Sequence, residues 1–173
     1  MHTKDAIRYS LEMANAGVMD PLASIEDVPT TFPTPQGGCH PLWVLGHLAY
    51  VEGATHQVLE IGENPLAAWA KLFEGGSTPA ADASQYPPFS EVRARYVELR
   101  QRTMAKLESL SEAELDTPTK FQPAGLEEHF KTYGKTLLTL AMHQMSHRAH
   151  ISDAVRAAGR PSKLTERLKG AAA

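Results

Sequence analysis

Three histidines in the last third of the chain have the spacing of a metal site. His143 and His147 are four residues apart, and His150 follows three residues later. Residues three or four apart share one face of a helix, so two imidazoles of such a pair can reach one metal ion. His143 and His150 are separated by about 10 Å along a helix axis, too far for all three rings to join easily. The pairs His143–His147 and His147–His150 therefore compete as ligands.

A further ligand has to come from another helix, and His47 is the strongest candidate. It stands alone in the apolar run LWVLGHLAYV, residues 42–51. A lone buried histidine is most often a core residue that donates to a carbonyl or a carboxylate. Three imidazoles on two apolar helices would each need such a partner, whereas one divalent ion would satisfy all three together.

The other four histidines are expected in loops or at the surface: His2, His40, His56 and His129. His56 lies nine residues after His47, so on a helix it faces almost the opposite way. Glu52 is also off the His47 face, and we expect it to be solvated or to cap, with a position behind the metal ligands as the alternative. Trp43 and Tyr50 share the His47 face, where they either pack in the core or wall a cavity beside a metal.

Several catalytic patterns are absent from the sequence. No glutamate is followed three residues later by a histidine, as a di-iron bundle would require. The zinc-protease pattern His-Glu-x-x-His, the Gly-rich phosphate loop and the nucleophile elbow are also missing. The single cysteine, Cys39, excludes an intramolecular disulfide framework and a Cys-rich zinc module, and we interpret it as structural.

The composition is that of one globular domain. The chain has 173 residues, of which 42% are hydrophobic, enough to bury a sizeable core. A net charge of −3 gives no electrostatic footprint for nucleic acid or for an anionic membrane, so neither is an expected partner. No apolar run is long enough to span a bilayer, and the polar start MHTKDAIRYS is not a signal peptide, so we expect a soluble cytoplasmic protein.

Prolines divide the chain into helices, because a proline inside a helix costs about 3 kcal/mol. Four long stretches are free of proline: 1–20, 42–64, 89–117 and 124–160. Each has apolar residues at helical spacing, and no segment alternates as a strand does. Pro41 suits a first helical position, Pro21 is expected to kink or end the first helix, and Thr132 is a candidate cap. The predicted fold is all-α: an antiparallel four-helix bundle over residues 1–161, with a long connection between its second and third helices, and a tail over 162–173.

Two segments resemble those of the DinB-like superfamily: GHLAYVE (46–52), and HQMSHRAHI (143–151) followed by AAGRP (157–161). These four-helix metal-binding proteins include bacillithiol S-transferases and mycothiol-dependent maleylpyruvate isomerase. The resemblance implies that the metal ligands are His47, His143 and His147, which decides between the competing pairs. Many members have His-Arg-Gly-Gln where this chain has His-Arg-Ala-His. The resemblance therefore leaves His150 as a residue beside the ligands or as a proton carrier.

The resemblance also implies a chemistry. Three imidazoles that leave positions open are typical of a catalytic zinc site. Imidazole suits several divalent ions, of which we expect Zn or Ni. The implied function is a metal-dependent enzyme of thiol S-transferase or hydrolase type, acting on a small-molecule substrate. The ion would lower the pKa of water or of a low-molecular-weight thiol.

Other functions remain open from the sequence. The main alternative is a non-catalytic bundle for binding or dimerisation, whose metal is structural or vestigial. A further alternative is that no metal binds and the histidines only pack. The resemblance also implies a homodimer, formed through the exposed face of the first helix or through the C-terminal tail.

Overall fold

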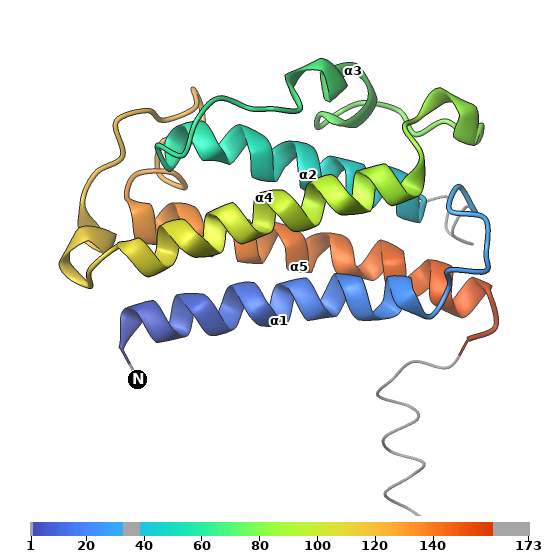
Figure 1. The fold of residues 1–173 in the computed structure, drawn as a ribbon, viewed down its shortest axis with the longest axis horizontal. Coiled ribbons are helices and arrows are strands. Elements are labelled where there is room, and N and C mark those ends of the chain that lie inside the picture. The colour runs from blue at the N-terminus through green and yellow to red at the C-terminus, as the bar shows by residue number, and fades with distance from the viewer. Residues whose placement is uncertain (1, 33–38, 161–173) are drawn as a thin grey trace, which may run out of the picture.

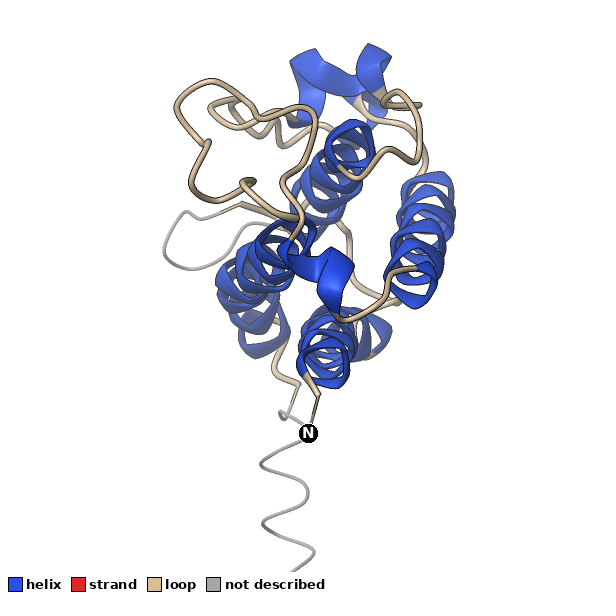
Figure 2. Ribbon diagram, turned by 90° about the vertical axis from the view of Figure 1, so that its left-hand side faces the viewer, coloured by secondary structure: helices blue, strands red, loops and turns tan. Residues whose placement is uncertain are grey.

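The computed structural model describes residues 2–32 and 39–160, and within them the long elements are all helices. Their bounds are Thr3–Ala23 (α1), Pro41–Val58 (α2), Phe89–Ser109 (α4) and Tyr133–Ala157 (α5). Figure 1 shows these four helices side by side, and Figure 2 looks along them. No strand occurs in the described ranges, so the all-α prediction is confirmed. The predicted tail, 162–173, lies outside the described residues, and the domain bounds stay a prediction.

The chain between α2 and α4 is long because these two helices run in the same direction (Figure 1). The intervening residues must therefore return along the bundle, and they form short helices: Ala67–Trp69 (η1), Ala70–Phe73 (α3) and Ala83–Gln85 (η2). A further short helix, Ala113–Asp116 (η3), precedes α5. The predicted long connection is confirmed. The antiparallel arrangement is not confirmed as a whole, because α1 and α5 also run the same way as each other (Figure 1).

The buried side of α1 has the predicted helical spacing. Five of its residues are buried at steps of four or three: Ile7, Leu11, Ala14, Val18 and Leu22. They pack mainly against α5, in two apolar clusters along the bundle. The helix continues to Ala23, so Pro21 does not end it.

Capping residues place the starts of α2 and α5. Pro41 occupies the first turn of α2, where its missing N–H costs no helical hydrogen bond. The Thr132 side chain accepts from the N–H of Lys135, 3.2 Å away, and caps α5 as predicted. No helix in the described part of the chain is long and apolar enough for a membrane span.

Candidate metal centre

His47 is held in one orientation by a backbone carbonyl. It lies on α2, a helix that α4, α5 and the α2–α4 connection surround, so most of its residues are buried. The His47 side chain is 5% exposed, and its Nδ1 lies 2.7 Å from the carbonyl oxygen of Phe73, at the end of α3. Since a carbonyl only accepts, the proton is on Nδ1, and Nε2 keeps a free lone pair.

Two histidines of α5 meet that lone pair. Nε2 of His143 lies 3.1 Å from Nε2 of His47. The ring of His147 is 4.8 Å from the ring of His47 and 4.7 Å from that of His143, measured between centroids. One nitrogen from each of the three rings lies within 4.8 Å of the others. The structure thus brings together the three histidines that the family resemblance implied.

All three rings are neutral at neutral pH. Burial, with a smaller contribution from the charge of His47, lowers the pKa of His143 to about 4. Burial, followed by the charges of neighbouring histidines, lowers the pKa of His147 to about 3. Burial also lowers the pKa of His47, although the Phe73 carbonyl opposes it. Metal ligation needs neutral imidazoles, so no proton has to leave before an ion binds.

A divalent cation fits this group of residues. Nδ1 of His147 is buried and has no hydrogen-bond partner among the described residues. A buried nitrogen without a partner is costly. An ion between the rings would satisfy imidazoles that the protein alone leaves incompletely paired. Three neutral nitrogen ligands suit Zn or Ni and do not suit Ca or Mg.

The α2–α4 connection covers one side of the cluster. The Trp43 ring stacks on His47, with 4.9 Å between centroids and 6° between planes. Its indole N–H donates to Ser77, whose hydroxyl donates to the Leu72 carbonyl, both at 3.0 Å. Trp43 therefore packs beside the cluster and also fastens the connection to α2.

Close packing of α3 on α2 depends on Gly46. A Cβ atom on this residue would lie 2.1 Å from a ring carbon of Phe73, far inside van der Waals contact. The missing side chain lets Phe73 approach, and the same residue supplies the carbonyl that accepts from His47. The local sequence Gly46-His47 thus couples a candidate ligand to the contact that orients it.

The two α5 histidines of the cluster are less buried than His47. His143 and His147 are only half-buried, in contrast to His47. The ring of His150 lies 5.9 Å from the ring of His147 between centroids, and it is also half-buried. His150 is outside the group of three, beside one of its members.

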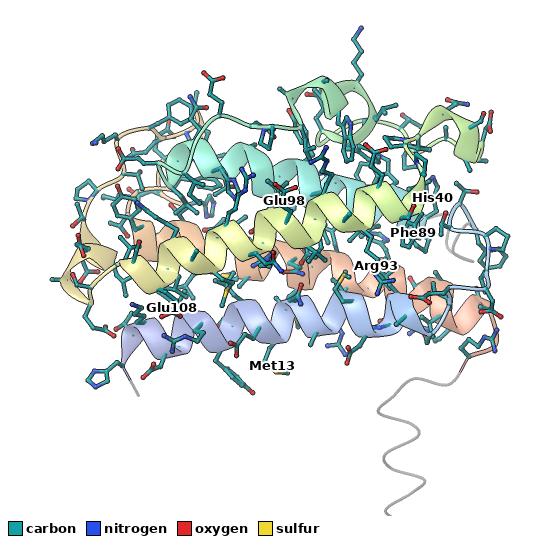
Figure 3. The ribbon with its side chains drawn as sticks, in the orientation of Figure 1. Met13, His40, Phe89, Arg93, Glu98 and Glu108 are labelled. Carbon is teal, nitrogen blue, oxygen red and sulfur yellow. The ribbon has the colours of Figure 1, made fainter. Side chains whose placement is uncertain are left out.

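Two histidines expected in loops or at the surface are buried. His40, 4% exposed, accepts from the N–H of Trp43 and donates to the Ala80 carbonyl, so it caps α2 at the end of the bundle where this helix begins (Figure 3). His56, 1% exposed, contacts the Leu99 carbonyl and the Thr103 hydroxyl. It faces away from His47 as predicted, but α4 covers that face. His2 and His129 are exposed, as expected.

Glu52 also corrects a prediction. It is 1% exposed rather than solvated, and it forms an ion pair of 2.9 Å with Arg100 of α4. The sequence feature that indicated burial of Glu52 was the apolar character of the surrounding α2 residues, which leaves Glu52 without a polar side of the helix to share. Tyr50 and Cys39 are half-buried.

Comparison with known protein families identifies the superfamily of the chain. The family model described as the DinB superfamily matches residues 19–151. The matched range includes all three histidines of the cluster. No curated protein matches the chain.

Proposed function

Since the chain belongs to the DinB superfamily, we propose that it binds one divalent metal ion through His47, His143 and His147 and is a metal-dependent enzyme. The observation that carries this proposal is the convergence of three neutral imidazoles from α2 and α5, two of them only half-buried. A site with three protein ligands and open positions is typical of catalytic zinc.

Such an ion would supply Lewis-acid chemistry, lowering the pKa of a thiol or of water so that either is a nucleophile near neutral pH. The protein's own groups prepare the site. The Phe73 carbonyl holds the proton of His47 on Nδ1, and Trp43 shields the His47 ring from water. Because His143 and His147 are half-buried, a small-molecule substrate and a low-molecular-weight thiol would approach the ion from their side. We propose thiol S-transfer or hydrolysis as the reaction.

Metal content tests the ligand assignment. The protein should be purified without a polyhistidine tag, and the metal per chain measured for the wild type and for His47→Ala, His143→Ala and His147→Ala. We expect close to one ion per chain, lost in each variant. His56→Ala is the matched control, because it removes a buried imidazole of α2 that is outside the cluster. Equal metal content in wild type and His47→Ala would refute the assignment.

Turnover tests the catalytic part of the proposal. A panel of low-molecular-weight thiols with electrophilic acceptors, and a panel of hydrolysable esters and amides, would be assayed with and without chelator. We expect an activity that chelation removes and that Zn or Ni restores. An activity that persists after complete removal of the ion would refute the mechanism.

The second candidate function is a binding module in which the ion is structural. It is favoured by the position of the cluster, since an ion there would join α2 to α5. Thermal unfolding with and without chelator separates the two functions. A large loss of stability with no turnover in either panel would favour the structural role.

We also propose a homodimer in the cytoplasm. Five large apolar side chains are exposed on the neighbouring helices α1 and α5: Tyr9, Met13, Leu138, Met142 and Met145. Met13 projects away from the other helices (Figure 3). Light scattering of the wild type and of Met13→Glu would test this face, with a monomeric wild type as the contrary result.

A further inference from the structure

A chain of polar side chains crosses the interior of the bundle and joins all four long helices. The Tyr96 hydroxyl of α4 donates to Asn15 of α1 at 2.9 Å, and the Gln144 amide of α5 donates to Tyr96. Arg100 of α4 donates to Gln144 at 2.7 Å and pairs with Glu52 of α2 at 2.9 Å. Arg100 is 7% exposed and Glu52 and Gln144 are each 1% exposed. A full ion pair therefore lies in the core.

The pairing of this ion pair is incomplete. The contacts of Arg100 with Gln144 and with Glu52 use the same nitrogen, Nη2. Its Nε and Nη1 are buried and have no hydrogen-bond partner within the described ranges, and neither has Oε1 of Glu52. The ion pair therefore has unpaired hydrogen-bond donors on Arg100 and an unpaired acceptor on Glu52.

The guanidinium remains charged in this setting. Burial alone would lower the pKa of Arg100, but the opposite charge of Glu52 and the contact with Tyr96 outweigh burial and raise it. A buried charge with unpaired N–H groups is one of the least favourable arrangements in a protein interior. The face of the guanidinium is partly covered, because its central carbon lies 5.9 Å from the Tyr96 ring centroid. The unused N–H groups lie at its edge.

The missing partner must both accept and donate hydrogen bonds. An anion would be repelled by Glu52, and a cation by Arg100. An apolar group would satisfy neither. Water is small, neutral, and able to accept from Arg100 while donating to Glu52.

We infer that the bundle contains an internal hydration site of about two ordered water molecules, bound between Arg100 and Glu52. The water accepts from Nε and Nη1 of Arg100 and donates to Oε1 of Glu52. This site shares no residue with the histidine cluster, and it does not depend on whether a metal binds there.

Nuclear magnetic resonance of the unmodified full-length protein tests the inference directly. In the ¹⁵N-labelled chain, the Nε–Hε signal of Arg100 is assigned by its loss in Arg100→Lys. We expect a rotating-frame Overhauser cross-peak between this proton and water, with the sign of a long-lived contact. A cross-peak of the opposite sign, which reports only proton exchange, or no cross-peak at all, would overturn the inference.

A pair of double variants gives a second measurement. Magnetic relaxation dispersion of water counts molecules that are held longer than the protein tumbles. Glu52→Leu with Arg100→Met removes every proposed partner, and we expect about two fewer such waters. The matched control, Glu26→Leu with Arg93→Met, removes an exposed ion pair of 2.6 Å between Arg93 of α4 (Figure 3) and Glu26 in the turn that follows α1, and it should leave the count unchanged.

The contrary result is an equal count in the wild type and in Glu52→Leu with Arg100→Met. A chain of this length holds about six buried waters on average. The test is therefore the difference in the number of long-lived waters between the wild type and the double variant, and not the total number in either protein. If the interior double variant fails to fold, the Overhauser measurement on the unmodified protein decides alone.

Discussion

Adding one methyl group at Gly46 should weaken the metal centre without touching a ligand. In Gly46→Ala the new Cβ would lie 2.1 Å from one ring carbon of Phe73 and 2.4 Å from two others. Carbon atoms in contact are about 3.5–4.0 Å apart, so the ring or the helix must shift by about 1.5 Å. Phe73 is fully buried, so any shift of its ring has to displace neighbouring core residues.

The shift has two measurable consequences. Overpacking of a core costs about 1–3 kcal/mol of the free energy of unfolding. Movement of Phe73 also draws its carbonyl away from Nδ1 of His47, a contact of 2.7 Å. Loss of a group that orients a metal-binding histidine lowers metal affinity by about 10–100-fold.

Urea unfolding of the metal-free protein measures the first effect, and chelator competition measures the second. Gly75→Ala is the control, because no atom lies within 4 Å of a Cβ placed there. Gly46→Ala combined with Phe73→Leu should recover part of the stability, since the smaller side chain makes room. Wild-type stability and wild-type metal affinity in Gly46→Ala would refute the packing explanation.

Three further predictions concern pH, capping and the interior ion pair. The metal-free protein should lose stability as the pH falls below about 6.5, because the histidines of the unfolded chain are protonated there, whereas the pKa values of His143 and His147 in the folded protein are about 4 and about 3. Urea unfolding at pH 7 and at pH 4.5 measures the free energy of unfolding, and His143→Gln with His147→Gln should make it depend less on pH. His40→Ala should lower the free energy of unfolding, measured in urea, by about 1 kcal/mol because α2 loses its cap. His129 is exposed, and His129→Ala should leave the free energy of unfolding unchanged. Arg100→Met should cost about 3–5 kcal/mol by leaving Glu52 buried and unpaired, whereas adding Glu52→Leu should restore most of the loss, and an unrestored double variant would contradict this account.

The sequence alone singled out His47 and the helical histidines, and the family resemblance chose between the two competing pairs. Because His147 follows four residues after His143, both rings lie on one helix face, and His47 is exceptional in an apolar run. The Pro-free stretches located the helices, because proline is costly inside a helix. The exception is Pro21, which α1 accommodates close to its C-terminal end.

The sequence did not show what lies opposite each helix face. Glu52 and His56 were expected to be solvated, at the surface or in a loop, because they face away from His47, yet α4 covers that face and supplies Arg100 and Thr103 as partners. Those partners are 48 and 47 residues away in the chain, and no local pattern pairs them.

Only the tertiary structure decided which groups complete the site. The carbonyl that orients His47 belongs to Phe73, 26 residues later, on a short helix whose approach Gly46 permits. The spacing of apolar residues along the sequence predicts which side of a helix is apolar, because residues three and four apart lie on the same side. The identity of the facing atoms depends instead on helix direction and packing, and these are set by contacts between residues distant in the chain.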